Sequence, residues 1–181
     1  MRGALPLALP GVLKGKMKME IREERQGDEA AIEAVTAAAF AGHPHSDGRE
    51  PAIVAGLRAA GALHLSLVAD EAGVILGHVT FSPVSLNGED LGWMGLGPVS
   101  VLPDRQGMGI GSALIRAGLA QLEAAGCPGV VLLGEPDYYA RFGFAAHAGL
   151  VLPGVPPAYF MARAFAGRVP TGEVAYHPAF G

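Results

Sequence analysis

The sequence predicts a single mixed α/β domain, because three features of the chain agree on that class. Its 181 residues are enough for one ordinary domain with a sizeable core. Hydrophobic residues make up 50% and charged residues 17%, which is typical of a folded globular chain rather than a disordered one. Strand-like and helix-like apolar patterns follow one another in the order β-α-α-β-β-β-α-β-α-β-β.

Residues 1–18 are expected to form a leader outside the fold, which leaves 19–181 as the domain. All of the protein's lysines fall in this leader, and two prolines interrupt its apolar stretch. Because no A-x-A cleavage site follows, the leader is not predicted to be a secretory signal. Met17 and Met19 are candidate alternative starts.

Net charge and the length of the apolar runs bear on the expected partners. The formal net charge is −4, so the chain shows no basic footprint for nucleic acid. No apolar run approaches the roughly 18 residues that a membrane-spanning helix needs. We therefore expect neither a nucleic-acid nor a membrane partner. Cys127 is the single cysteine, which excludes an internal disulfide and leads us to expect a cytoplasmic location.

The first third of the domain predicts one strand and two helices. Residues 19–25 alternate weakly in polarity, as a strand does. Asp28 is a candidate N-cap for the first helix, whose apolar residues recur on one face. After a polar loop, Ser46 or Asp47 is expected to cap a second helix that ends at Gly61.

The middle third is rich in strands. Residues 63–70 and 73–86 predict two strands joined by a short turn, and "NGED" at 87–90 is typical of a tight hairpin turn. The next predicted strand, 91–101, contains Gly97 and Pro98. Glycine inside a strand often marks a bulge or a place where a ligand approaches the backbone, so we expect a bulge there.

The last third begins with a helix that runs to about Ala125. Residues 129–134 form a short continuous apolar run, as a strand buried on both faces does. Residues 136–144 predict a short helix closed by a glycine. The segments 148–153 and 157–165 predict the last two strands.

A glycine-rich turn, "RQGMGIG", opens the long helix, with Gly107, Gly109 and Gly111 at every second position. Such a turn is typical of an anion site, because backbone N–H groups and the positive helix end converge there. A P-loop needs a lysine, which the chain lacks after residue 18. A dinucleotide fingerprint needs G-x-G-x-x-G/A, which this spacing does not supply. Each helical glycine costs about 1 kcal/mol relative to alanine, so a functional reason is favoured over simple tolerance.

The Q-x-x-G-x-G motif that begins at Gln106 resembles the acyl-CoA loop, [QR]-x-x-G-x-[GA], of the GNAT acetyltransferase superfamily. Two further segments are similar to that family. "YYARFGF" at 138–144 resembles its Tyr-x-x-x-Gly-Phe segment, and "GEVAYHPAF" at 172–180 resembles the tail of one bacterial subgroup. The likeness extends over roughly 19–180, which is nearly everything outside the leader.

The resemblance implies a mostly antiparallel, twisted mixed sheet of about seven strands with about four helices, in which the fourth and fifth strands splay apart. It also implies acetyl-CoA as the acyl donor, hence a site for CoA, and no metal. The pantetheine arm is expected in the gap, with its pyrophosphate on the glycine turn and a backbone N–H near Val99 polarising the thioester carbonyl. The residues expected to bind the donor are Pro98, Val99, Ser100, Val101, Arg105, Gln106, Gly107, Met108, Gly109, Ile110, Gly111, Ser112, Tyr139 and Phe142.

The implied reaction is a direct attack of an amine on acetyl-CoA, without a covalent enzyme intermediate. Tyr139 occupies the family's tyrosine position, where it acts either as the acid for the departing thiolate or only as a hydrogen-bonding partner of the sulfur. Glu135, just past the fifth expected strand, is the preferred base. His78, His64 and a chain of waters remain alternatives. Tyr138 is expected to be a wall or core residue, because adjacent helical residues do not share a face.

The acceptor is expected to be a small-molecule or protein amine. The loop at 43–51 is where the family shapes its acceptor pocket, and Trp93 and Met94 either line that pocket or pack in the core. His43 and His45 form a weak metal signal without further ligands, so no metal is predicted. An acyl-CoA-binding sensor without turnover and a transferase for a longer acyl group remain alternatives. Family members are often dimers, so a homodimer is one assembly that the resemblance allows.

Overall fold

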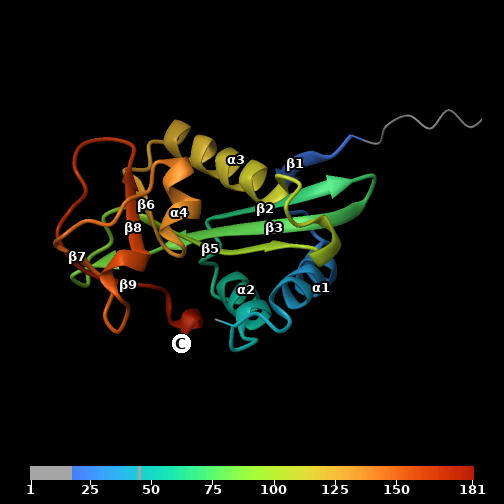
Figure 1. Ribbon diagram of the computed structural model, residues 1–181, viewed down its shortest axis with the longest axis horizontal. Coiled ribbons are helices and arrows are strands. Elements are labelled where there is room, and N and C mark those ends of the chain that lie inside the picture. Colours follow the sequence, from blue (N-terminus) through green and yellow to red (C-terminus); the bar gives the residue numbers. More distant parts are fainter. Residues whose placement is uncertain (1–17, 45) are drawn as a thin grey trace, which may run out of the picture.

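The computed structural model describes residues 18–44 and 46–181, so the expected leader, except for Lys18, and His45 lie outside the described residues. Over this part of the chain, strands form a larger and a smaller sheet, and helices cover both faces of the larger one (Figure 1). None of the helices that the structure describes is long and apolar enough to span a bilayer.

The larger sheet has six strands in the order β1-β2-β3-β5-β6-β8. Every neighbouring pair in it is antiparallel except β5 and β6, which are parallel. This confirms the predicted mixed, mostly antiparallel sheet. Its strands are β1 (Glu20–Glu23), β2 (Leu65–Glu71), β3 (Val74–Pro83), β5 (Met94–Val101), β6 (Gly129–Leu133) and β8 (Phe160–Ala164).

The smaller sheet pairs short strands that come from distant parts of the chain, β4 (Ser85–Leu86), β9 (Gly172–Ala175) and β7 (Leu150–Val151), in that order. The described residues therefore hold nine strands where about seven were expected. Two differences explain the count. The predicted strand at 73–86 is divided at Val84, whose N–H bonds to the carbonyl of Trp93 at 3.1 Å. Residues 172–175 become a strand only because the chain returns to β4.

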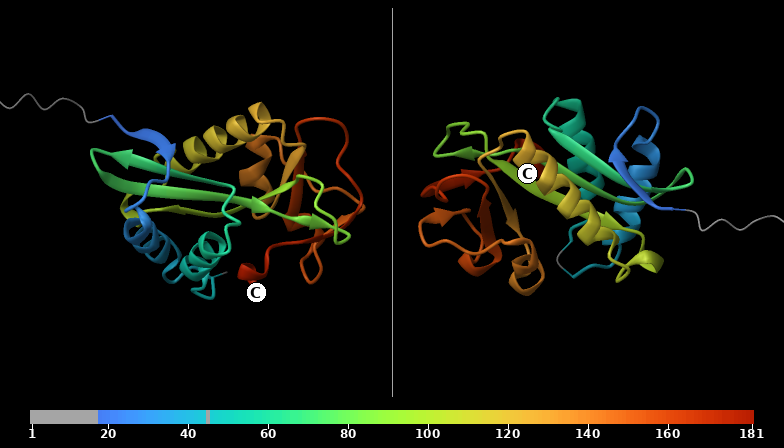
Figure 2. Two further views of the ribbon diagram at one scale, coloured as in Figure 1. Left: turned by 180° about the vertical axis from the view of Figure 1, so that it is seen from behind. Right: turned by 90° about the horizontal axis from the view of Figure 1, so that it is seen from above.

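The larger sheet lies between two helical layers, with α3 (Ile110–Ala124) on one face and α1 (Glu29–Phe40) with α2 (Glu50–Ala59) on the other (Figure 2). The apolar stripe of α3 buries Leu114 and Ile115 completely against the sheet. Ile32 of α1 and Val54 of α2 form a separate cluster on the opposite face. A short helix, α4 (Pro136–Tyr139), follows β6 and continues as a 3₁₀ turn over Ala140–Phe142.

The predicted helix caps are wrong in detail, because neighbouring groups compete for the same side chains. Asp28 stands at the N-cap of α1 but caps nothing, since its carboxylate accepts from Arg22 at 2.6 Å and from the N–H of Arg25 at 2.8 Å. The N-cap of α2 is Arg49. Ser46 instead donates to the carboxylate of Glu50 at 2.8 Å.

The predicted tight turn at 87–90 is confirmed. Asn87 and Gly88 both adopt left-handed φ values, 50° and 83°, as a type I′ turn requires, and Glu89 donates its N–H to Leu86 at 2.9 Å. The strand after the turn starts at Met94 rather than at 91. Trp93 and Met94 are buried in two core clusters, which settles their role as packing residues.

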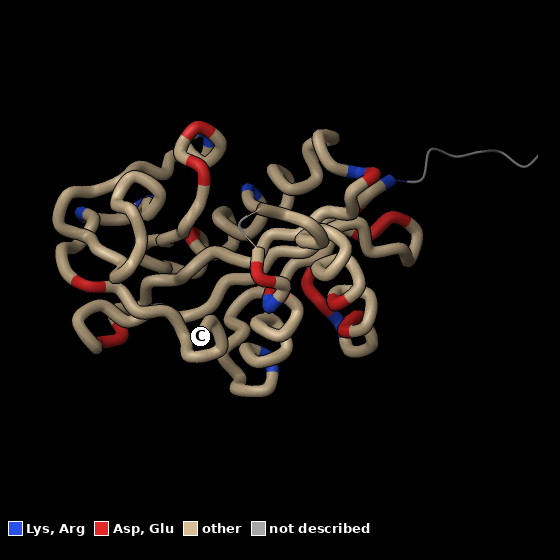
Figure 3. The backbone as a smooth tube through the Cα atoms, turned by 60° about the horizontal axis from the view of Figure 1, so that its bottom comes forward, with Lys and Arg blue, Asp and Glu red and all other residues tan. Residues whose placement is uncertain are grey.

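Charged residues are spread over the chain rather than gathered on one face (Figure 3). A partly buried group of ion pairs ties β1 to its neighbours: Arg22 bridges Asp28 of the α1 N-terminus and Asp70 of β2, at 2.6 Å and 2.8 Å. The hydrogen bond from Arg22 is the main reason why the pKa of Asp28 lies below its ordinary value. Elsewhere among the described residues, a guanidinium nitrogen of Arg105, just after β5, lies 3.6 Å from the carboxylate of Glu71, and one of Arg163 in β8 lies 3.7 Å from that of Glu123.

Candidate active site

The site begins where β5 and β6 stop pairing. These strands pair at two positions, Met94 with Val130 and Gly95 with Val131, and separate beyond them. The predicted splay of these two strands is therefore confirmed. On its other side, β5 pairs with β3, where Phe81 is opposite Leu96 and Val79 is opposite Val99. Two residues of β5 therefore lie between these pairs where β3 has one. This is the bulge predicted at Gly97 and Pro98.

Beyond the splay, β5 has a free hydrogen-bonding edge. Leu102 donates its N–H to Leu76 of β3 at 2.9 Å, and ladder bonds alternate along an antiparallel pair. Alternation directs the main-chain groups of Val99 and Val101 away from β3, toward the gap. The side-chain amide of Gln106 donates to the carbonyl of Val101 at 3.1 Å, which is consistent with that direction.

Two predicted donor-binding residues of β5 do not belong to this edge. The same alternation turns the main chain of Ser100 toward β3, and its buried hydroxyl donates to Thr36 of α1 at 3.3 Å. Pro98 has no N–H and is buried. Ser100 therefore lies away from the free edge on which Val99 and Val101 lie, because only alternate residues of a strand share an edge.

The glycine turn leads from β5 into α3. Gly107 and Gly109 adopt left-handed φ values of 74° and 84°, which glycine adopts without strain and other residues rarely do. Gly109 is the N-cap of α3, and no side chain caps the helix there. The first N–H groups of α3 are therefore free to bind an anion, and the helix dipole adds positive potential at the same place.

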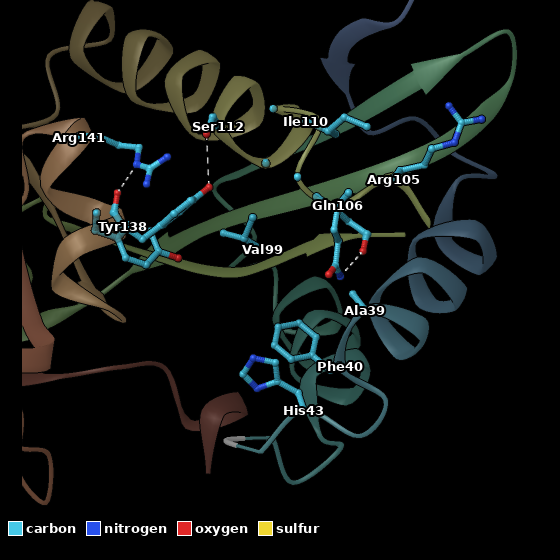
Figure 4. Close-up of a pocket in the computed structure, with 15 residues that line it drawn as sticks. Ala39, Phe40, His43, Val99, Arg105, Gln106, Ile110, Ser112, Tyr138 and Arg141 are labelled. Atoms are coloured by element: carbon cyan, nitrogen blue, oxygen red, sulfur yellow. Dashed lines mark hydrogen bonds between the residues drawn. The ribbon is translucent and has the colours of Figure 1, made fainter. Parts of the chain in front are cut away.

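These elements enclose a cleft of about 460 Å³, which is the size of an ordinary small-molecule site. Figure 4 shows the residues that line it, from the end of α1, the free edge of β5, the glycine turn and α4. They are Ala39, Phe40, His43, Val99, Val101, Arg105, Gln106, Gly107, Gly109, Ile110, Gly111, Ser112, Tyr138, Tyr139 and Arg141.

Ten of the residues predicted at the site line this cleft, namely Val99, Val101, Arg105, Gln106, Gly107, Gly109, Ile110, Gly111, Ser112 and Tyr139. Three others, besides the two on β5, do not. Met108 is 65% exposed and does not line the cleft. Phe142 is buried in the core beneath Arg116, whose guanidinium lies 5.0 Å from its ring centre. Glu135 is exposed at the N-cap of α4 and outside the cleft lining.

Tyr139 lies in a largely apolar setting at the α4 wall. Its ring contacts those of Tyr138, Phe142 and Phe144. Burial is the main reason why the pKa of Tyr139 rises to about 12. The phenol therefore stays protonated at neutral pH. A Cβ atom at Gly134 would overlap the Tyr139 ring, so glycine is needed there to seat it.

Tyr138 lines the cleft as well, as a wall residue. Its hydroxyl lies 3.5 Å from that of Ser112 at the start of α3, and the guanidinium of Arg141 lies 4.5 Å from its ring centre. Adjacent tyrosines on one short turn thus occupy different parts of the same wall: Tyr138 toward the glycine turn, Tyr139 among the aromatic core residues.

Sequence reasoning missed three lining residues, Ala39, Phe40 and Arg141, whereas Tyr138 was expected as a wall or core residue and His43 lies in the loop expected to shape the acceptor pocket. Phe40 and His43 pack edge to face, with ring centres 6.1 Å apart, at the C-terminal end of α1. Their place at the cleft depends on how α1 lies over β5, and no local pattern in the sequence reveals that.

The other candidate bases lie elsewhere. His78 is completely buried, its Nε2 lies 2.8 Å from the hydroxyl of Ser66, and burial is the main reason why its pKa falls to about 4. Ser66 in turn donates to Glu24, which also accepts from Arg58 at 2.8 Å. His64 is exposed and not among the lining residues.

Neither Cys127 nor a metal cluster enters the site. The thiol of Cys127 is half-buried, and burial raises its pKa. Its Sγ contacts the carbonyls of Gly92 and Gly129 at 3.4 Å and 3.3 Å. Among residues 18–44 and 46–181, no three His, Cys, Asp or Glu side chains gather as metal ligands would.

Comparison with known proteins agrees with this geometry. The family model described as "Acetyltransferase (GNAT) family" matches residues 29–144. The uncharacterized N-acetyltransferase YhbS of Escherichia coli K12 is 40% identical over 169 residues, which cover 90% of this chain and 98% of YhbS. A GNAT family acetyltransferase from Brucella melitensis, solved with acetyl-CoA, is 54% identical with a TM-score of 0.83 and covers 91% of this chain and 99% of its own. YhbS solved with CoA has 35% identity and the same TM-score, covering 94% and 96%.

Proposed function

Because this chain belongs to the GNAT acetyltransferase family and is an acyltransferase, we propose that it transfers an acetyl group from acetyl-CoA to an amine by direct attack. The observation that carries the proposal is the cleft itself. It joins a free strand edge to an uncapped, glycine-rich helix start, and a buried phenol lies on its wall.

The pantetheine arm and the pyrophosphate of acetyl-CoA suit different groups of this cleft. The amide groups of the pantetheine arm suit the outward N–H and C=O groups of Val99 and Val101, as an added strand would. The pyrophosphate suits the N–H groups between Gly107 and Gly111 at the positive end of α3. Arg105, partly exposed at the cleft, adds a cation there. A bound structure of a 54% identical relative with acetyl-CoA supports this choice of donor.

The chemistry then follows from what each group can do. The N–H of Val99 is placed to polarise the thioester carbonyl, and so to stabilise the charge that develops on its oxygen. Tyr139 keeps its proton at neutral pH, so it can donate it to the sulfur that leaves. Glu135 has no comparable position, because it is exposed and does not line the cleft.

The acceptor is an amine that approaches past Phe40 and His43, which line the cleft at the end of α1. A sensor that only binds acyl-CoA would use the same cleft without turnover. A direct experiment distinguishes the two. Calorimetry measures acetyl-CoA binding, and thiol release is followed with a panel of n-butylamine, spermidine, L-phenylalaninamide and 4-methoxyaniline. We expect binding together with amine-dependent release. Binding without release from any amine would favour the sensor, and no binding would remove the proposal altogether.

The matched test of the acid uses two tyrosines. We expect Tyr139→Phe to lower kcat about 10²- to 10⁴-fold, the usual range for a proton-transferring side chain, with acetyl-CoA affinity unchanged. Tyr159→Phe is the control, because Tyr159 is 41% exposed and does not line the cleft. A Tyr139→Phe enzyme with wild-type kcat would leave Tyr139 as a packing residue only.

A further inference from the structure

We propose that His43 is the catalytic base that receives the proton of the acceptor amine. The inference rests on the proposed function and deepens it at the same site. Amide formation from an amine releases a proton from nitrogen, and alkyl ammonium groups hold that proton up to pH values near 10. A side chain that accepts this proton near the reacting atoms therefore contributes substantially to the rate of acetyl transfer.

Among the ionisable side chains that line the cleft, one can act as the base. The described residues that line it include Arg105, Arg141, Tyr138, Tyr139 and His43, and no carboxylate. Arginine stays protonated at any working pH, and a phenol accepts a proton only when it is ionised. Burial raises the pKa of Tyr139 to about 12 and so keeps it in the acid role. Imidazole is the side chain that both gains and loses a proton near neutrality.

The position of His43 suits the role. Its backbone N–H bonds to the carbonyl of Phe40 at 3.0 Å, which fixes the turn at the end of α1. The Phe40 ring meets the imidazole edge to face and limits its orientation. Figure 4 shows Phe40 and His43 together beneath the β5 edge, while Tyr138 enters from the α4 side. Tyr139, the proposed acid, follows Tyr138 at the end of α4, so the proposed acid and base come from different elements that line the cleft.

His43 also has access to solvent and lies close to a carboxylate. The residue is exposed, so a proton that it accepts can pass to water. Behind it lies a second hollow of about 230 Å³, lined by Phe40, His43, Ser46 and Glu50 among others. The charged and titratable groups that line these two hollows with His43 are therefore Glu50 of α2, Arg105 at the glycine turn, the two tyrosines of α4, and Arg141 of the 3₁₀ turn that follows α4.

The proposed step balances as follows. The amine nitrogen forms a bond to the acetyl carbonyl carbon, and one N–H proton passes to the unprotonated ring nitrogen of His43. The carbon–sulfur bond breaks, and the sulfur takes the proton of the Tyr139 hydroxyl. Water then removes the proton from His43 and returns one to Tyr139. The products are an amide and free CoA thiol.

The test compares His43→Gln and His43→Ala with wild type, using whichever amine of the panel gives the fastest thiol release. We expect His43→Gln to lower kcat/KM about 10²- to 10⁴-fold and to remove the acidic limb of the pH–rate profile. Acetyl-CoA affinity should not change. Added imidazole should restore part of the rate of His43→Ala. His147→Gln is the matched control, because His147 is exposed and outside the cleft lining.

The outcomes separate this inference from the function on which it rests. If wild type turns over while His43→Gln keeps the same rate and the same pH profile, His43 is not the base and the acetyltransferase function stands. A rate loss that imidazole does not rescue, equalled by Phe40→Leu, would reduce His43 to a wall residue. If wild type releases no thiol with any amine, the proposed function fails and this assignment falls with it.

Discussion

Replacing Gly109 by alanine tests whether the left-handed turn ahead of α3 is needed. The φ of Gly109 is +84°, and nothing lies within 4 Å of a Cβ atom added there. The penalty of Gly109→Ala is therefore purely conformational, about 1–2 kcal/mol for an L-residue in the left-handed region. A domain of this size changes its Tm by about 2–4 °C for each kcal/mol, so we expect Tm to fall by about 2–8 °C.

Gly111→Ala is the matched control, two residues further along. Gly111 lies inside α3 with an ordinary helical φ, and an added Cβ would meet its nearest atoms at 3.5 Å and 3.6 Å, which is normal contact. Alanine is favoured over glycine inside a helix by about 0.5–1 kcal/mol, so Tm without ligand should rise by about 1–4 °C. The two substitutions are chemically identical, and only the backbone conformation gives them opposite signs.

The assay is thermal unfolding followed by circular dichroism, with and without acetyl-CoA. If the turn in Gly109→Ala changes conformation to relieve this strain, the N–H groups at the start of α3 also change direction. The rise in Tm that acetyl-CoA produces should therefore be smaller in this variant than in wild type. If Gly109→Ala unfolded at the wild-type temperature and gave the full ligand-induced shift, the turn would not depend on the left-handed conformation, and the argument from glycine would be wrong.

Three further predictions concern single side chains. Gly134→Ala should displace the Tyr139 ring and lower kcat about 10²-fold, because misplacement of a reacting group by about 1 Å has effects of that size. Single-turnover kinetics measures this rate. An unchanged kcat would show that Gly134 does not hold the Tyr139 ring in place. Tyr139 should contribute no falling limb to the pH–rate profile of wild type below about pH 11, since its pKa is raised to about 12; a limb between pH 8 and 10 that Tyr139→Phe removes would contradict this. Burial lowers the pKa of His78 to about 4, so the unfolded chain takes up a proton that the folded chain refuses between about pH 4 and 6.5, and stability falls as the pH drops through that window. Urea unfolding should show that the free energy of unfolding of wild type falls by about 1 kcal/mol from pH 6 to pH 5, and that His78→Asn abolishes this fall. The same dependence of the free energy of unfolding on pH in both proteins would contradict the prediction.

Local features of the sequence predicted the backbone conformation around the cleft well. The glycine turn, the bulge at Gly97 and Pro98, and the splay of β5 and β6 depend on conformational limits that a few adjacent residues express. The tight turn at Asn87 and Gly88 was predictable for the same reason. Where backbone chemistry decides the structure, a short stretch of sequence is enough.

Side-chain direction and long-range packing could not be predicted from local sequence patterns. Ser100 was expected at the donor, but ladder alternation turns its main chain inward, and the register with β3 that decides this is not visible in the sequence. Phe142 was expected in the cleft, yet its 3₁₀ turn directs it beneath Arg116 of α3. Phe40 was missed as a cleft residue because only the packing of α1 against β5 brings it to the cleft.

Amide hydrogen exchange, followed residue by residue by NMR with and without CoA, measures most directly whether the free edge and the turn hold the donor. The geometry predicts that CoA slows exchange at Val99, at Val101 and across residues 106–111, while amides of Ser100 and the β1–β2 pair change little. Protection confined to another part of the molecule, or no protection at these amides at saturating CoA, would contradict the proposed binding site.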